Sequence, residues 1–142
     1  MAHVDDCRLI ELRTVYDQRG SISFVESGVD VPFEFLRAYW TYDVPSRATR
    51  AGHAHKSLRQ LYVAMSGSFD VHLDDGANQR VVRLAHPNEA LLMGPGIWRE
   101  IHNFSSNACL MVLASTHYNE ADYLRTHEEF MAWVAAQATP AG

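Results

Sequence analysis

Two histidines separated by a single residue are the part of the sequence best suited to chemistry. They lie in the stretch Gly52-His53-Ala54-His55. On a β-strand, residues two apart point to the same face and lie about 7 Å apart, so both imidazoles would enter one cavity. Imidazole has a pKa near neutrality and can move protons in both directions. The alternative interpretation is that an isolated His-x-His merely ends a strand at the surface.

The residues that follow the histidines favour the cavity. Gln60 and Gly67 come after Gly52-His53-Ala54-His55 at the spacing of the first cupin motif, and Gly94-Pro95-Gly96-Ile97-Trp98 with Asn103 resembles the second. Two motifs in the right order are more specific than either motif alone. The resemblance implies an all-β fold, a cupin-type jelly-roll β-barrel, with the histidine pair in its interior.

The same motifs predict that no metal is bound. Metal-binding cupins place a carboxylate at the position of Gln60 and a third histidine at the position of Trp98. Two neutral imidazoles, an amide and an indole make a poor site for a divalent cation. His102 is the only nearby substitute ligand, and on a strand it would share a face with Trp98 and Glu100. We expect the histidines to act as acid and base without a cofactor. A metal-dependent cupin, either a dioxygenase or a metal-using isomerase, is the alternative.

Longer stretches of the chain resemble one enzyme family, the nucleotide-sugar 3,4-ketoisomerases. The resemblance runs from about Arg8 to Phe130. It is carried by Arg37-Ala38-Tyr39, Arg50-Ala51-Gly52-His53-Ala54-His55-Lys56, Gln60-Leu61, Gly67-Ser68-Phe69, Leu73-Asp74-Asp75-Gly76, Pro95-Gly96-Ile97-Trp98-Arg99-Glu100, Asn103-Phe104-Ser105 and Tyr118-Asn119-Glu120-Ala121-Asp122-Tyr123-Leu124-Arg125. Two departures are mild: Ala51 stands where a glycine is common, and His102 stands where an aromatic residue is expected.

This resemblance implies an activity and a set of roles. Members of the family are homodimers without a required metal. They convert dTDP-4-keto-6-deoxyglucose to a dTDP-3-keto-6-deoxyhexose on the way to 3-amino-3,6-dideoxysugars. Their paired histidines match His53 and His55, their pocket tyrosine matches Tyr39, and their arginines match Arg37 and Arg50. A sugar-nucleotide-binding module without turnover is a second alternative.

The chemistry follows from such a substrate. The C4 ketone acidifies the hydrogen on C3, so a base can remove it to give an enediol intermediate. Protonation at C4, with proton transfer between the two oxygens, then gives the 3-ketone. We assign His55 to the carbon-bound proton and His53 to the oxygens. Tyr39 would relay protons or polarise the ketone.

Further residues are candidate substrate contacts. Arg37 and Arg50 would bind the diphosphate through charge-assisted hydrogen bonds, and the ring of Trp98 would pack on the sugar or the base. Strand alternation would point Arg99 to the opposite face from Trp98, unless the preceding turn distorts the strand. Tyr16 and Arg99 are the first positions to test for control of the C4 configuration. The full set of substrate-binding candidates is Tyr16, Arg37, Arg50, Gln60, Trp98, Arg99 and Asn103.

The elements that must position these residues are mostly short strands. Apolar or alternating runs are separated by turn signals every 8 to 12 residues or so, which is typical of an all-β sandwich or barrel. We expect the strands over 8–12 and 21–26 to form a hairpin, and a long strand to run over 53–65. Asp74-Asp75-Gly76 predicts the turn of a second hairpin.

One helix is predicted, at the C-terminal end of the sequence. It would run over 119–136 with Asn119 as its N-cap, followed by a frayed tail over 137–142. The residues that recur at helical spacing are Tyr123, His127, Phe130 and Val134.

Composition bounds the remaining possibilities. A chain of 142 residues with 47% hydrophobic content is the usual size of one domain, here 1–142. Its net charge of -5 argues against a nucleic-acid partner, and the absence of a long apolar run argues against a membrane span. Two cysteines, Cys7 and Cys109, and no leader-like start predict the reducing cytoplasm. Edge strands that need cover predict a homodimer.

Overall fold

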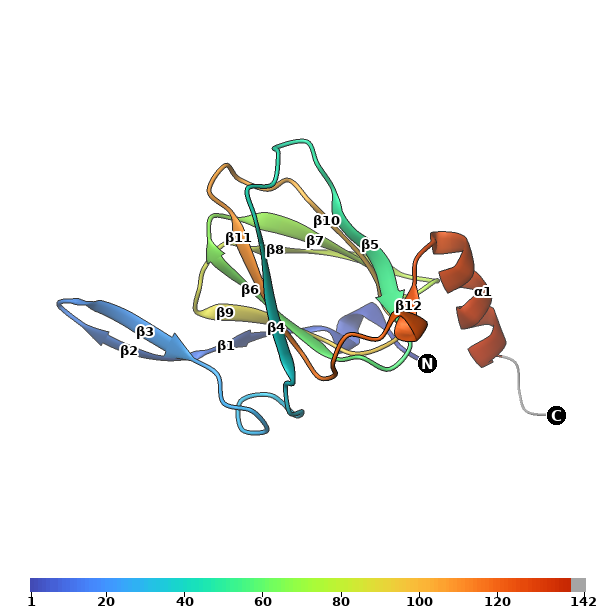
Figure 1. The fold of residues 1–142 in the computed structure, drawn as a ribbon, viewed down its shortest axis with the longest axis horizontal. Coiled ribbons are helices and arrows are strands. Elements are labelled where there is room, and N and C mark those ends of the chain that lie inside the picture. The colour runs from blue at the N-terminus through green and yellow to red at the C-terminus, as the bar shows by residue number, and fades with distance from the viewer. Residues whose placement is uncertain (139–142) are drawn as a thin grey trace.

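Two five-stranded antiparallel sheets face each other and enclose the interior of a barrel in this computed structural model, which describes residues 1–138 (Figure 1). The first, which we call the β6 sheet, contains in order β1 (Arg8–Glu11), β9 (Glu89–Met93), β6 (Gln60–Ser66), β11 (Cys109–Ala114) and β4 (Arg37–Tyr42). The second, the β10 sheet, contains β12 (Tyr123–Leu124), β5 (Arg50–His55), β10 (Trp98–His102), β7 (Phe69–Asp74) and β8 (Gln79–Leu84). Outside them lie the hairpin of β2 (Arg13–Asp17) and β3 (Gly20–Phe24), the short 3-10 helices η1 (Val4–Asp6) and η2 (Glu120–Asp122), and α1 (His127–Ala138).

The main core lies between the two sheets. In β7, Phe69, Val71 and Leu73 are buried while the residues between them are more exposed, which is the period-two pattern of a strand. They belong to one apolar cluster with Leu110 and Val112 of β11 in the opposite sheet. Full burial of one such side chain contributes about 1.5–3 kcal/mol. This packing therefore holds the sheets face to face.

A second apolar layer covers the outer face of the β6 sheet. Leu61 and Val63 of β6 are buried there, although they point away from the barrel interior. Val31 and Phe33, from the connection between β3 and β4, complete this cluster. The connection thus shields part of a sheet face that would otherwise be exposed.

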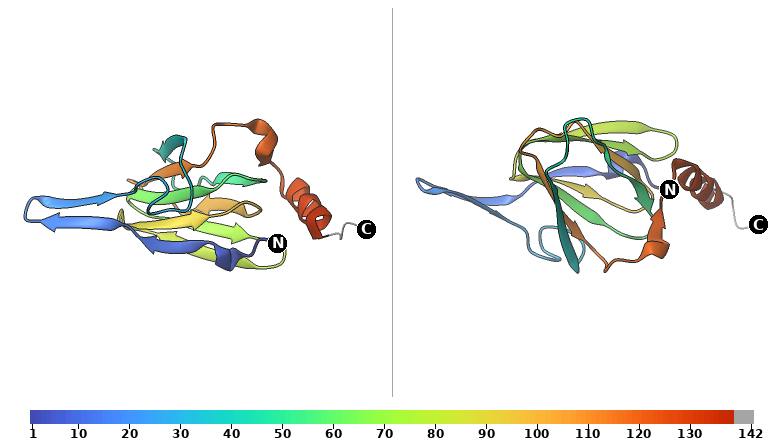
Figure 2. Two further views of the ribbon diagram at one scale, coloured as in Figure 1. Left: turned by 90° about the horizontal axis from the view of Figure 1, so that it is seen from below. Right: turned by 45° about the horizontal axis from the view of Figure 1, so that its top comes forward.

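The N-terminal hairpin differs from the one that the sequence predicted. The segments 8–12 and 21–26 do not pair; β1 pairs with β9, and β2 pairs with β3. The N–H of Leu12 donates to the backbone of the turn before β9 at 2.7 Å, so the first strand stays on the barrel. Asp17 then accepts a hydrogen bond from the N–H of Arg19 at 2.7 Å and stabilises the hairpin turn. The hairpin extends away from the barrel (Figures 1 and 2).

The single strand predicted over 53–65 is two strands in different sheets, β5 and β6. Between them, the carboxylate of Asp122 accepts hydrogen bonds from the N–H groups of Ser57 at 2.9 Å and Leu58 at 3.1 Å. These bonds satisfy backbone donors that a continuous strand would pair in a ladder. The chain therefore crosses from one sheet to the other at this point.

The helix predicted over 119–136 begins later. Asn119 caps a helix, since its side chain accepts a hydrogen bond from the N–H of Ala121 at 3.1 Å, but that helix is the single turn η2. β12 follows and pairs with β5, placing Tyr123 opposite His55, so α1 starts at His127. Residues of β12 pair with β5 where the sequence predicted the first helical turns, because this pairing satisfies the backbone N–H and C=O groups that a helix would have satisfied.

α1 packs on the outer face of the β10 sheet. Phe130 is fully buried in a cluster with Ala54, Trp98 and Leu124. Residues 137 and 138 of the predicted tail belong to α1, and 139–142 lie outside the described residues. None of the helices within 1–138 has the length and apolar character to cross a membrane. The predicted fold class, an all-β jelly-roll barrel with a short C-terminal helix, is confirmed; that 1–142 forms one domain stays a prediction.

Candidate active site

An irregularity in β5 precedes the two histidines. Ala51 and Gly52 both have positive φ, at 66° and 72°, and the pairing register with β10 shifts beside them. This is a β-bulge, which re-aims the side chains that follow it. Ala51 keeps its left-handed conformation at a cost of about 1–2 kcal/mol. Beyond the bulge His53 and His55 share the inner face of the strand, as the sequence predicted, while Ala54 packs outward under α1.

The two imidazoles lie against each other inside the barrel. Their ring centroids are 4.8 Å apart, and His53 is 9% and His55 1% exposed. Burial, and then the guanidinium of Arg99, lower the pKa of His53 to about 3. The same two causes, in the same order, lower the pKa of His55 well below its ordinary value. Both rings are therefore neutral near pH 7.

Three ring nitrogens of this pair have no hydrogen-bond partner although they are buried. They are Nε2 of His53 and both nitrogens of His55. The backbone of Ala51 forms a hydrogen bond with the His53 side chain that raises its pKa, so the Ala51 carbonyl accepts from the ring. The neutral His53 ring then keeps its lone pair on Nε2. Such a nitrogen can accept a proton from a ligand.

A buried guanidinium lies directly across from the histidines. Arg99 of β10 pairs with His53 of β5, so the two side chains share the inner face. Arg99 is 1% exposed, and its Nη1 donates to Oε1 of Gln60 at 2.5 Å. Gln60 Nε2 in turn donates to the hydroxyl of Tyr39 at 3.0 Å. Burial raises the pKa of Tyr39 above its usual value, so its hydroxyl keeps its proton.

Arg99 also lacks a counter-ion. Its other hydrogen bonds go to the backbone oxygen of Ile97 and to the side chain of Tyr62, and within 1–138 no carboxylate forms an ion pair with it. An unpaired cation in a protein interior is costly. Negative charge on a bound ligand would stabilise it.

A cavity of about 290 Å³ opens beside His53. Of the two histidines, His53 lines it and His55 does not. Arg50 and Arg125 add two cations to its wall. The full lining is Tyr39, Thr41, Thr49, Arg50, Ala51, His53, Tyr62, Ile101, Leu110 and Arg125. The cavity therefore combines a proton acceptor, a protonated phenol and positive charge.

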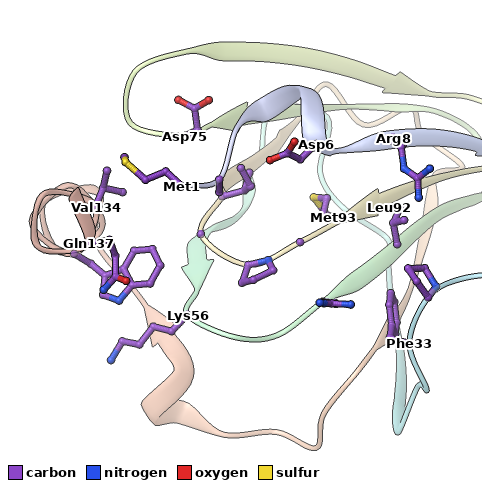
Figure 3. Close-up of a pocket in the computed structure, with 18 residues that line it drawn as sticks. Met1, Asp6, Arg8, Phe33, Lys56, Asp75, Leu92, Met93, Val134 and Gln137 are labelled. Atoms are coloured by element: carbon purple, nitrogen blue, oxygen red, sulfur yellow. The ribbon is translucent and has the colours of Figure 1, made fainter. Parts of the chain in front are cut away.

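A larger cavity, of about 520 Å³, lies outside the barrel (Figure 3). It extends from Val134 and Gln137 of α1, past Met1 at the chain start, to Phe33. It contains none of the residues that the sequence singled out for chemistry. We therefore place the active site in the smaller cavity, because the unpartnered imidazole nitrogen and the tyrosine are there.

The arginines predicted to bind substrate lie at this site. Arg50 is exposed on the cavity wall. Arg37 is half-buried, its guanidinium lies 5.4 Å from the ring of Tyr39 and 5.6 Å from that of Tyr118, and its Nε is buried without a partner. Arg50 therefore lines the cavity, whereas Arg37 lies beside it, next to the lining residue Tyr39.

Three other candidates are placed elsewhere. Trp98 points outward from β10, where its Nε1 donates to Glu100 at 2.9 Å and its ring packs near Phe130. Alternation gives the inward position to Arg99 instead, so we leave Trp98 out of the site. Asn103 lies in the turn after β10 with a φ of 59° and donates to Asp70 at 3.1 Å. Tyr16 is 67% exposed on the β2–β3 hairpin, away from the barrel (Figure 2).

The segment between β11 and α1 supplies residues that sequence reasoning missed. The ring of Tyr123 lies 5.2 Å from that of His53 and 4.4 Å from that of His55. Arg125 stacks over Tyr123 at 3.8 Å and is held by Glu120 through hydrogen bonds of 2.9 and 2.6 Å. The Arg125 contact lowers the pKa of Glu120 to about 2. The sequence analysis assigned these residues to a helix because of their spacing. The stretch Tyr118 to Arg125, which resembles the ketoisomerase family, was the signal that could have placed them at the site.

Comparison with known proteins identifies the family of this chain. The family described as FdtA, WxcM-like, C-terminal, matches residues 5–135, and the chain belongs to that family. A TDP-4-oxo-6-deoxy-alpha-D-glucose-3,4-oxoisomerase of Aneurinibacillus thermoaerophilus is 38% identical over 128 residues, which are 90% of this chain and 92% of that protein. The resemblance noted from the sequence is thus confirmed.

Solved structures show the same relationship. A 3,4-ketoisomerase from Helicobacter canadensis aligns with a TM-score of 0.89 and 40% identity, covering 92% of this chain and 98% of the other. The sugar 3,4-ketoisomerase QdtA from Thermoanaerobacterium thermosaccharolyticum, in complex with TDP, aligns with a TM-score of 0.92 and 29% identity, covering 96% and 100%. A histidine-to-asparagine mutant of QdtA is known in complex with TDP-4-keto-6-deoxyglucose.

Proposed function

We propose that this protein converts dTDP-4-keto-6-deoxyglucose to a dTDP-3-keto-6-deoxyhexose, a step in the formation of 3-amino-3,6-dideoxysugars. The observation that carries the proposal is the set of unpartnered imidazole nitrogens beside the unpaired cation Arg99. A buried polar group without a partner costs about 1–3 kcal/mol, which a purely structural histidine pair would avoid. The related 3,4-oxoisomerase and the QdtA complexes support this choice of substrate.

His53 is the base that removes the proton from C3. It lines the cavity, and its neutral ring carries the lone pair on the free Nε2. The C3–H electrons form the C3–C4 double bond, and the C4 carbonyl becomes an enediolate oxygen. This reverses the order expected from the sequence, where His55 was assigned to carbon.

His55 and Tyr39 then move the oxygen-bound protons. The proton on O3 leaves as the C3 carbonyl forms, the oxygen of C4 receives a proton, and C4 takes a proton from the imidazolium of His53. No proton is gained or lost overall. The protonated Tyr39 hydroxyl, held by Gln60, is a donor for the developing oxygen charge.

The arginines stabilise negative charge along the substrate. Arg99, directly across from His53, lowers the energy of the enediolate, in the way that fixed donors stabilise oxyanions in other enzymes. Arg37, Arg50 and Arg125 face the diphosphate through charge-assisted hydrogen bonds. Positive charge is thus available at both ends of the ligand.

Product analysis tests the function directly. Purified protein is incubated with dTDP-4-keto-6-deoxyglucose and the sugar is followed by NMR. A 3-keto product supports the proposal. Binding of dTDP with the sugar unchanged would indicate a binding module, and turnover that needs an added divalent ion would indicate a metal-dependent cupin.

We further propose that the protein acts as a homodimer. Trp40 and Tyr42 of β4 are 61% and 62% exposed, and Met65 of β6 is 51% exposed, all in the β6 sheet. Exposed apolar side chains gathered on one sheet mark an interface, and a second copy of the same face would cover them. The β2–β3 hairpin could then reach the partner, which is how Tyr16 would approach a substrate. We place the reaction in the cytoplasm, since Cys7 and Cys109 are free thiols.

A further inference from the structure

Asp122 is a partly buried carboxylate next to one of the two histidines. Its Oδ2 lies 3.5 Å from Nδ1 of His55, and its side chain is 12% exposed. Within the described residues it forms no ion pair with lysine or arginine. The nearest titratable group that can share its charge is therefore the imidazole.

The position of this carboxylate is fixed by the turn between β5 and β6. Oδ1 accepts from the N–H of Ser57 at 2.9 Å and from its hydroxyl at 2.6 Å, and Oδ2 accepts from the N–H of Leu58 at 3.1 Å. The backbone oxygen of Asp122 accepts from the N–H of Lys56 at 3.0 Å. Asp122 is thus attached through both its backbone and its side chain to the residues that directly follow His55.

A fixed acceptor on one side of a neutral imidazole selects its tautomer. The proton goes to the nitrogen that faces the carboxylate, and the lone pair stays on the other nitrogen. Both ring nitrogens of His55 are buried without a hydrogen-bond partner, and the carboxylate 3.5 Å from Nδ1 is the acceptor that would draw the proton to Nδ1 and leave the lone pair on Nε2. Tyr123, the next residue, packs its ring 4.4 Å from the His55 ring and holds it from another side.

We propose that Asp122 is a positioning residue that orients His55, keeps it in the Nδ1-protonated tautomer and stabilises its imidazolium. The inference rests on the proposed function, in which His55 takes up and returns an oxygen-bound proton. Each uptake creates a buried positive charge, and a carboxylate at 3.5 Å compensates it. Asp122 does not contact the cavity; it acts through His55.

Asp75 provides a matched comparison. It is 5% exposed and accepts hydrogen bonds from the N–H groups of Val4, Ala77 and Asn78 at 2.9, 2.9 and 2.7 Å. It stabilises a turn as Asp122 does, but no histidine forms an ion pair with it among residues 1–138. An effect specific to Asp122 therefore separates positioning of the imidazole from support of a turn.

The test replaces Asp122 by asparagine and reads the tautomer of His55 from the nitrogen–proton NMR spectrum of its ring. If the asparagine oxygen keeps both hydrogen bonds from Ser57, the amide nitrogen points toward His55. The amide N–H then donates to Nδ1 of His55, and the ring proton moves to Nε2. We expect the Nδ1-protonated form in the parent and the Nε2-protonated form in Asp122→Asn. We also expect kcat to fall about 10- to 100-fold with KM nearly unchanged. Asp75→Asn should leave both the tautomer and kcat as in the parent.

Two results would overturn the proposal. One is an Nε2-protonated His55 in the parent protein, which needs no variant to fold. The other is a folded Asp122→Asn variant with the parent's tautomer and kcat. The tautomer is measured without substrate, so it also separates the two proposals. A tautomer change in a protein that does not convert the ketosugar would uphold the positioning role and refute the proposed function.

Discussion

Acid should destabilise this protein through its buried histidines before its carboxylates titrate. His53 has a pKa of about 3 in the folded chain and 6.5 as its ordinary value. Between those values the unfolded chain binds a proton that the folded chain does not, so stability rises with pH and is lost as pH falls through 6.5. Over a pH unit in which His53 is fully protonated in the unfolded chain and neutral in the folded chain, the free energy of unfolding changes by about 1.4 kcal/mol. From pH 7 to pH 5, where protonation is partial at first, His53 alone should lower the free energy of unfolding by about 1.9 kcal/mol.

The measurement is urea unfolding at pH 7, 6 and 5 for the parent and for His53→Asn. The variant lacks the titrating group, so it should lose about 1.9 kcal/mol less than the parent over this interval. His55 contributes with the same sign in both proteins, because its pKa is also lowered by burial and by Arg99. His72→Asn replaces an exposed histidine of β7 and is the control for the substitution of histidine by asparagine itself. Equal losses in the parent and in His53→Asn would show that His53 is not a buried neutral imidazole.

Further predictions concern the reaction and the assembly. His53→Asn should lower kcat by about 10²- to 10⁴-fold while the affinity for dTDP is kept, and a rate within a few-fold of the parent would exclude His53 as the base. Turnover by the parent in D2O should place deuterium at C4 of the product, as detected by NMR. Arg37→Ala should weaken dTDP binding by about 1.5–3 kcal/mol in calorimetry, and unchanged affinity in a folded variant would exclude Arg37 as a diphosphate ligand. Activity should survive dialysis against a chelator, since no group of three or more His, Cys, Asp or Glu side chains in 1–138 could hold a metal ion; loss of activity that one divalent ion restores would contradict this. Light scattering at micromolar concentration should give about twice the chain mass of 16.0 kDa, and the mass of a monomer would refute the homodimer.

The inward-facing histidine pair could be predicted because it depends on local geometry. A strand has a period of two, so His53 and His55 must share a face once β5 is recognised as a strand. The side-chain directions of residues in the second motif, Gly94 to Asn103, were harder to predict, because a shift of one residue exchanges the two faces of a strand. Trp98 was matched to the inward position that Arg99 occupies, and the sequence contains no signal that fixes this register.

Residues distant in the sequence could not be assigned in the same way. Asp122 meets the turn after His55 across a separation of 65 residues, and only the pairing of β12 with β5 brings them together. Tyr123 has a place in a helical pattern with His127 and Phe130, which favoured helix over strand. Hydrogen bonds to β5 decided otherwise, since sheet pairing overrides a local helical preference.

The segment that completes the site follows every barrel strand from β1 to β11 in chain order. During synthesis the two histidines therefore leave the ribosome long before Asp122, Tyr123 and Arg125 do. Once β11 has left the ribosome, the strands of the two large sheets can pair. The imidazoles of His53 and His55 then still lack their contacts with Asp122 and Tyr123. Domains form as units while synthesis proceeds from the N-terminus. We therefore expect the barrel to form first and activity to require that the segment from Tyr118 to Arg125 has docked along the edge of β5.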